Sequence, residues 1–135
     1  MSPAISFSGK TSRGPFYELI LKGEKVLTTR YPRLKGRIEA GDLVNLYWKQ
    51  RQPMLFIATP GNMHYSKPIH KIGEAYVVNV SRVFNLLDAI LTIPDYIRGE
   101  GFRDLAELHG YWGTNTVTAT QTGPLDVIRF KLKVK

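Results

Sequence analysis

Residues 23–30, with the sequence GEKVLTTR, contain a dense group of reactive and charged side chains. They place two cations and two hydroxyls in one short segment: Lys25, Thr28, Thr29 and Arg30. A threonine hydroxyl becomes an effective nucleophile when a base takes its proton, and a lysine with a lowered pKa can be that base. The segment is therefore a candidate for catalysis or for ligand binding.

The local geometry restricts how these side chains can cooperate. In a regular strand Lys25 and Thr28 would point to opposite faces, about 10 Å apart. They can act together only if Lys25 lies in the turn before the strand, or if a bulge intervenes. Thr28 and Arg30 share a face of a regular strand. The alternative is structural: the two cations are exposed at the strand ends, and Thr28 is present because threonine favours strands.

The sequence predicts short strands and short helices around this segment. Helices are predicted at residues 14–22, with Pro15 at the first helical position, at 94–98, and from the capping residue Asp104 onward. Strands are predicted at residues 25–31, 43–48, 54–59, 75–83 and 125–134. We expect one domain over residues 1–135, with an N-terminal arm at 1–13 and an extended loop region at 51–70. This region contains the predicted strand 54–59 and, at 60–68, an exposed loop or, alternatively, a disordered insert. The fold class expected is α+β: a small barrel of five or six mostly antiparallel strands, with short helices packed at its ends.

The positive charge of the chain is concentrated in its first half. Residues 1–72 contain 12 lysines and arginines against 4 acidic residues, whereas residues 73–135 contain 7 of each. A concentrated positive field favours polyanions, and nucleic acid is the first of these. The alternative is a solvated basic surface without a specific partner.

Several classes of site and location are excluded or disfavoured. The chain has no cysteine, which excludes disulfides and thiolate metal sites, and His64, His70 and His109 lack ligand spacing. We therefore expect no metal and no cofactor, and the chain has no P-loop, GxGxxG or GxSxG motif. No apolar run is long enough for a membrane span and no secretory signal is visible, so we expect no membrane partner and a cytoplasmic location.

A basic run with aromatic residues indicates where RNA would bind. The run consists of Arg30, Arg33, Lys35 and Arg37, and Tyr31 lies within it. Cations that contact phosphate and aromatic rings that stack on bases are typical of single-stranded RNA binding. Tyr111 and Trp112, which stand between two glycines, are further stacking candidates at a surface or cleft wall. The alternative for the basic run is a solvated turn.

The order of motifs in the chain resembles that of ASCH domains, a branch of the PUA-like superfamily. Residues 23–30 resemble the signature G-x-K-x-x-T-x-R of that family. The other matching features are Gly41-Asp42 before an apolar strand, Glu100-Gly101-Phe102 followed by Glu107-Leu108, and Val127-Ile128-Arg129-Phe130 in the last strand. Together they cover the chain from about Phe16 to Phe130. The resemblance implies a PUA-like pseudo-barrel with a cleft lined by the signature segment.

The resemblance also implies activities for the cleft. ASCH domains are widely taken to bind RNA, and ribonuclease activity has been attributed to members of the family. Some small members are amidohydrolases that remove the acyl group from N4-acetylcytidine by using a lysine, a threonine and a glutamate, which would fall on Lys25, Thr28 and Glu100. This chain departs from the small hydrolases in its longer segment 51–70, which contains three prolines.

Three functions agree with these sequence features. In the first, the basic cleft binds RNA or a modified nucleotide. Phosphate is contacted by Lys25, Arg30 and the run at residues 33–37, and a base edge forms hydrogen bonds with Thr28 and Glu100. The site is completed by Thr29, Tyr31, Tyr111 and Trp112. In the second, the cleft hydrolyses an acyl amide on a cytosine-type base, with Lys25 as the base; phosphodiester cleavage is a variant of it. In the third, the domain is an adaptor whose basic surface binds an acidic protein.

Overall fold

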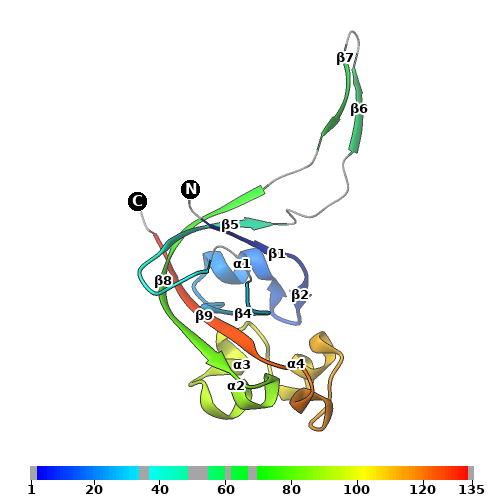
Figure 1. Cartoon of the computed structure of the whole chain (residues 1–135). Coiled ribbons are helices and arrows are strands. Elements are labelled where there is room, and N and C mark those ends of the chain that lie inside the picture. Colours follow the sequence, from blue (N-terminus) through cyan, green and yellow to red (C-terminus); the bar gives the residue numbers. More distant parts are fainter. Residues whose placement is uncertain (1–2, 34–36, 49–54, 60–61, 67–69, 134–135) are drawn as a thin grey trace.

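A curled, mixed sheet of five strands forms a half-barrel at the centre of the computed structural model (Figure 1). The structure describes residues 3–33, 37–48, 55–59, 62–66 and 70–133. The strand order is β1 (Ala4–Phe7), β5 (Leu43–Trp48), β8 (His70–Val83), β9 (Leu125–Leu132) and β4 (Leu27–Arg30). β1 is parallel to β5, and the other neighbours are antiparallel. The predicted α+β class, with a barrel-like and mostly antiparallel sheet, is confirmed at this level.

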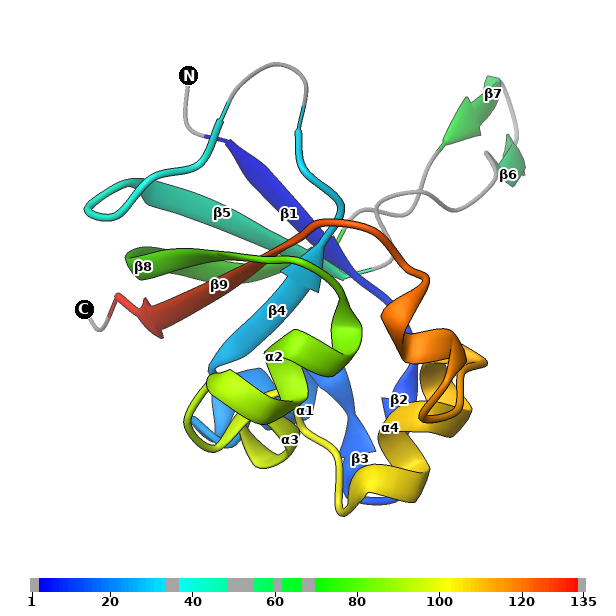
Figure 2. The same ribbon diagram turned by 60° about the horizontal axis from the view of Figure 1, so that its bottom comes forward.

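Short helices lie at one end of the sheet. Figure 2 shows α2 (Leu86–Thr92), α3 (Tyr96–Gly99) and α4 (Leu105–Trp112) gathered there, and the 3-10 turn η1 (Thr118–Thr120) contacts α2. No helix in the described part of the chain is long and apolar enough to cross a membrane.

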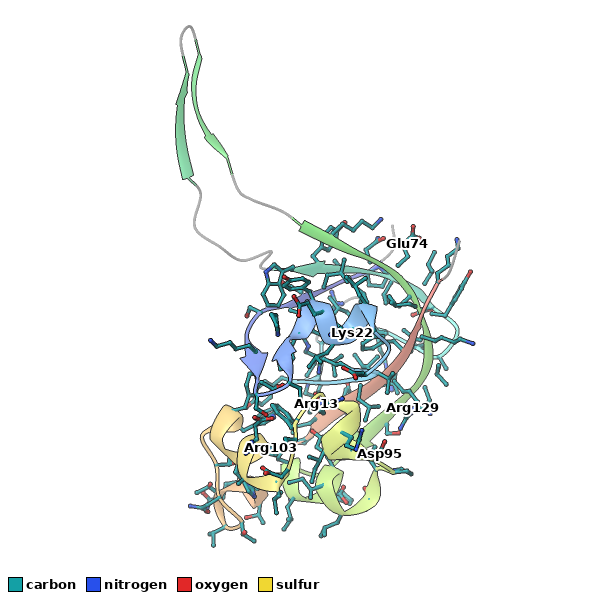
Figure 3. All side chains as sticks on the ribbon, turned by 180° about the vertical axis from the view of Figure 1, so that it is seen from behind. Arg13, Lys22, Glu74, Asp95, Arg103 and Arg129 are labelled. Atoms are coloured by element: carbon teal, nitrogen blue, oxygen red, sulfur yellow. The ribbon has the colours of Figure 1, made fainter. Side chains whose placement is uncertain are left out.

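The last strand has the two-sidedness that its alternating sequence predicts. Ile128 and Phe130 are buried in the core, whereas Lys131 and Lys133 are exposed. On the outer face, the guanidinium of Arg129 donates a hydrogen bond to the Pro94 carbonyl oxygen at 3.3 Å, and Figure 3 labels Arg129 beside the segment that carries Asp95. This contact joins β9 to the chain that leads into α3.

Helix α4 begins where the capping signal predicts. The Asp104 carboxylate accepts a hydrogen bond from the Glu107 amide at 2.9 Å, and the Glu107 carboxylate accepts one from the Arg103 amide at 2.8 Å. The apolar residues after the cap predict that Leu105 and Leu108 both pack on the core. Leu108 is buried as predicted, but Leu105 is 41% exposed. The prediction was wrong for Leu105 because this residue, directly after the cap, lies on the outer side of the first turn.

The region before the signature segment differs from the predicted helix 14–22. Gly14–Pro15 forms the short strand β3, which pairs with β2 (Lys10–Thr11), and helix α1 extends only over Phe16–Leu21. Pro15 is the residue before the helix, with extended backbone angles, because pairing with β2 holds it in a strand conformation. The helical spacing of Phe16, Leu19 and Ile20 predicts that they face the core, and all three are buried. The N-terminal arm 1–13 contributes β1 and β2.

The region 51–70 contains a hairpin rather than one long loop. β6 (Leu55–Thr59), predicted as a strand, pairs antiparallel with β7 (Asn62–Ser66), and the hairpin projects away from the rest of the fold in Figure 1. The prediction of a loop over residues 60–68 was therefore wrong at 62–66. Residues 62–66 form a strand because their backbone hydrogen-bonding groups pair with β6. The sequence of the segment by itself does not predict this pairing. The other residues of the predicted loop lie outside the described part of the chain.

Candidate functional site

A cavity of about 320 Å³ lies between β1, β4, α1 and α4. It is lined by Ser6, Phe7, Ser8, Phe16, Lys25, Thr28, Thr29, Arg30, Tyr31, Glu100, Tyr111 and Trp112. The lining thus brings together four parts of the chain: the N-terminal arm, helix α1, the signature segment with the adjoining Tyr31, and the segment around α3 and α4. Eight of these residues are site residues predicted from the sequence or the resemblance.

Lys25 lies in the turn before β4, which is the position that lets it share a site with Thr28. Its backbone amide donates to the Leu19 carbonyl oxygen at 3.0 Å, and regular strand structure begins only at Leu27. The side chain is 2% exposed and its Nζ has three acceptors: the Leu27 carbonyl oxygen at 2.8 Å, the Glu100 carbonyl oxygen at 2.7 Å, and Glu100 Oε2 at 2.9 Å. The alternative that Lys25 is an exposed strand-end charge is excluded.

The number of acceptors identifies the charge state of this pair. An ammonium has three N–H donors and a neutral amine has two, so three acceptors around Nζ require the ammonium form. Burial lowers the pKa of Lys25 below its ordinary value, and the adjacent Glu100 carboxylate opposes that shift. The resting site is therefore an ammonium–carboxylate pair that is nearly removed from water.

The second oxygen of the Glu100 carboxylate belongs to a directional hydrogen-bond chain. Thr29 Oγ1 donates its single proton to Glu100 Oε1. The Tyr96 hydroxyl lies 2.6 Å from Thr29 Oγ1 and must therefore be the donor in that contact. Burial raises the pKa of Tyr96, which keeps its hydroxyl protonated for this role. Glu100 is thus held from both sides, by Lys25 at one oxygen and by Thr29 at the other.

Thr28 and Arg30 form a second polar pair on the cavity side of β4. Thr28 is 4% exposed, and its Oγ1 accepts a hydrogen bond from Arg30 Nε at 3.0 Å. The Arg30 guanidinium also donates to the Ser6 carbonyl oxygen at 2.6 Å, which connects β4 to β1 across the cavity. A cation that donates to a hydroxyl oxygen stabilises negative charge on that oxygen. The arrangement suits a hydroxyl that either attacks an electrophile or binds a polar ligand edge.

Aromatic rings form the walls around these polar groups. Lys25 Nζ lies 4.6 Å from the centroid of the Phe16 ring, and Arg30 Cζ lies 5.0 Å from that of Phe7. Tyr111 packs against Phe16 with ring centroids 5.5 Å apart. The cavity therefore has a polar, charged floor and aromatic sides, the combination that commonly binds planar polar ligands.

Two glycines beside Glu100 permit its close approach to β4. Gly101 has φ +101°, a conformation that favours glycine, and a Cβ added at Gly99 would lie 2.6 Å from Leu27 Cδ1. The Gly99 carbonyl oxygen also accepts a hydrogen bond from the Val26 amide at 2.8 Å. Both glycines are needed because backbone must pack directly against the turn that carries Lys25.

We expect Gly99→Ala to lower the free energy of unfolding by about 1–3 kcal/mol, because the new methyl group overpacks the buried Leu27. The matched control is Gly110→Ala in α4, where an added Cβ has no neighbour within 4 Å. Alanine is the better helix former, so this variant should gain about 0.5–1 kcal/mol. Urea unfolding measures both changes, and a Gly99 variant as stable as the Gly110 variant would contradict the proposed close packing.

The structure leaves some predicted residues out of the cavity. Arg33 and Arg37 are exposed and do not line it, and Lys35 lies outside the described residues. Sequence reasoning missed the contribution of Tyr96 and assigned Thr29 only to ligand binding. One signal was available for Tyr96: it precedes Glu100 by four residues, which on a helix places the two on one face.

Among the residues that the structure describes, no group of three histidine, cysteine, aspartate or glutamate side chains could hold a metal ion. Comparisons of the chain with protein-family models, with curated protein sequences and with solved structures found no match.

Proposed function

We propose that this domain binds a single nucleotide unit, presented by RNA or by a modified nucleoside, in the cavity between β1, β4 and α4. The observation that supports the proposal best is the composition of that cavity: Lys25, Thr28, Arg30 and Glu100 at the floor, with aromatic rings at the sides. Its volume of about 320 Å³ suits one small planar ligand with its sugar. The resemblance to ASCH domains, which are widely taken to bind RNA, agrees with this proposal.

The polar groups of the floor match a base edge with both donors and acceptors. The Glu100 carboxylate accepts hydrogen bonds from Lys25 and Thr29, and exocyclic amino groups of bases are suitable further donors to it. Arg30 supplies positive charge and donors beside it. The net charge of +8 favours a ligand that carries phosphate.

The second candidate function is hydrolysis of an acyl amide on a cytosine-type base, and the 2.9 Å contact between Lys25 Nζ and Glu100 Oε2 favours it. A water molecule would attack the acyl carbon directly, or Thr28 would attack it first and a water molecule would then release the acyl group. The proton of the attacking group would pass to Lys25 in its neutral form, and the carbon–nitrogen bond would break as the nitrogen takes up a proton. The products would be a carboxylic acid and the free amine.

The resting ammonium form of Lys25 restricts how this reaction could begin. Lys25 can accept a proton only after it has passed one to Glu100 along their shared hydrogen bond. A ligand that covers the cavity would favour this transfer, because excluding water disfavours the charged pair relative to the neutral one. Glu100 would then return that proton to the leaving nitrogen.

The test is titration of the protein with N4-acetylcytidine, cytidine and a short single-stranded RNA, with the products followed in the same samples. We expect binding of the nucleosides and RNA affinity that falls steeply with salt. Thr28→Val removes the cavity hydroxyl at nearly constant volume and should weaken binding by about 2- to 12-fold, the worth of one neutral hydrogen bond. Thr116→Val, at an exposed position that does not line the cavity, is the control.

The two candidate functions give different outcomes in this experiment. Binding without product formation supports the binding role alone. Deacetylation by the wild type that disappears in Thr28→Val, while binding persists, supports the hydrolase. Absence of binding by every ligand, or RNA binding that does not depend on salt, contradicts the proposal.

A further inference from the structure

The aromatic residues at the cavity mouth differ from those at its floor. Phe7 and Phe16 are 3% and 4% exposed, whereas Tyr31 and Tyr111 are 63% and 52% exposed, although all four line the cavity. The buried rings pack on the cations of the floor. The rings of Tyr31 and Tyr111 therefore have solvent-exposed surface that a ligand bound only at the floor would not cover.

Tyr31 is held at the mouth by an aromatic partner. Its ring lies edge to face with that of Trp112, with centroids 6.5 Å apart and planes at 65°. A ring that is 63% exposed cannot have both faces covered, so Tyr31 presents at least one face to solvent. A large planar ring that is fixed by one neighbour and open on one face has the geometry of a base-stacking platform.

The chain that follows Tyr31 carries positive charge that no ion pair among the described residues neutralises. Arg33 and Arg37 are exposed, and in the described part of the chain neither forms an ion pair. The carboxylates of the cavity and of α4, Glu100 and Glu107, are engaged with Lys25 and with the Ser12 and Arg103 amides. Positive charge next to an open aromatic face suits a phosphate joined to a stacked base.

We propose that Tyr31, supported by Trp112, forms a second stacking position at the mouth of the cavity, and that the ligand is single-stranded RNA of at least two nucleotides rather than a free nucleoside. This inference rests on the proposed function, because it assumes that one base enters the cavity. The neighbouring base then stacks on the open face of Tyr31, and the backbone continues toward Arg33.

The experiment compares cytidine, its monophosphates, and the two dinucleotides that cytidine and adenosine form in either order. Comparison with the monophosphates separates the contribution of the second base from that of the phosphate. In the wild type, one dinucleotide should bind about 5- to 150-fold more tightly than the corresponding monophosphate, the usual range for one base stacked on an aromatic side chain.

Variants at the mouth assign this gain to Tyr31. Tyr31→Ala should remove most of the gain, so that the dinucleotide loses more affinity than cytidine does, whereas Tyr31→Phe, which keeps the ring, should retain most of the gain. Tyr76→Ala is the matched control, because Tyr76 is 45% exposed on β8 and does not line the cavity. A control variant that also lost the gain would show that the loss does not come from this site.

The outcomes separate this inference from the proposed function. Cytidine binding with no gain for either dinucleotide overturns the inference and leaves the proposed function standing. Equal weakening of cytidine and dinucleotide by Tyr31→Ala also overturns it, because Tyr31 would then belong to the nucleoside site. Failure of all these ligands to bind the wild type overturns both.

Discussion

Replacing Glu100 with glutamine is expected to lower the free energy of unfolding by about 3–5 kcal/mol at neutral pH. The change leaves the Lys25 ammonium buried without its counter-charge, although its two carbonyl acceptors remain. A buried ion that loses its partner keeps its desolvation cost and loses the attraction that offsets it. Urea unfolding followed by tryptophan fluorescence measures the loss.

The pH dependence of this loss has a definite sign. Glu100 raises the pKa of Lys25 against the effect of burial, so its removal should lower the pKa of Lys25 in the folded state further. At pH values between this lowered pKa and the pKa of lysine in the unfolded chain, ~10.4, the unfolded chain binds more protons than the folded protein does. The stability of the variant therefore rises with pH in this range. The loss should therefore be complete below the folded pKa of Lys25 and shrink as the pH approaches the unfolded value.

Two controls test whether the buried pair causes the effect. Lys25→Met combined with Glu100→Gln removes both charges and should recover part of the lost stability. Glu74→Gln breaks the 3.8 Å surface pair with Lys71 and should change stability by less than about 1 kcal/mol. If Glu100→Gln costs no more than Glu74→Gln, the pair is not buried as described.

Replacing Phe102 with alanine is expected to lower the free energy of unfolding by about 3–5 kcal/mol. Phe102 is 1% exposed, and its ring packs against Phe16 at 6.2 Å and Tyr111 at 5.3 Å between centroids. Its removal leaves a void behind two walls of the cavity. We therefore also expect weaker ligand binding in the fraction of protein that remains folded.

The matched control for this variant is Phe84→Ala. Phe84 is 82% exposed, so its truncation removes little buried apolar area and should change stability by no more than about 0.5 kcal/mol. Unfolding of both variants at the same urea concentration would mean that Phe102 does not carry the packing described for it. The comparison needs no ligand and is therefore independent of the proposed function.

The buried polar network explains why so small a site can have a defined shape. Lys25, Glu100, Thr29 and Tyr96 satisfy one another in one chain of contacts. Each group restricts the next, so the carboxylate has little freedom to rotate before a ligand arrives. A preorganised site loses less conformational freedom on binding than a mobile one.

Local features of the sequence were sufficient to predict several parts of this protein. Alternation of apolar and charged residues indicated β9, and the side chain of Asp104 three residues before Glu107 indicated the start of α4. The density of cations and hydroxyls at residues 23–30 indicated where the site would lie. Such signals are readable because a strand period or a helix cap depends on residues only two to four positions apart.

Other features depend on contacts between parts of the chain that are far apart in the sequence. The family resemblance indicated Glu100 as a site residue, but not its partners. Glu100 contacts Lys25 and Thr29, and Tyr96 contacts Thr29; these contacts join positions 67 to 75 residues apart. The same holds for β7, which is a strand because β6 pairs with it, and for Leu105, which the packing of α4 leaves exposed. Contacts at long separation depend on how the whole chain packs, so neither local propensity nor periodicity determines them.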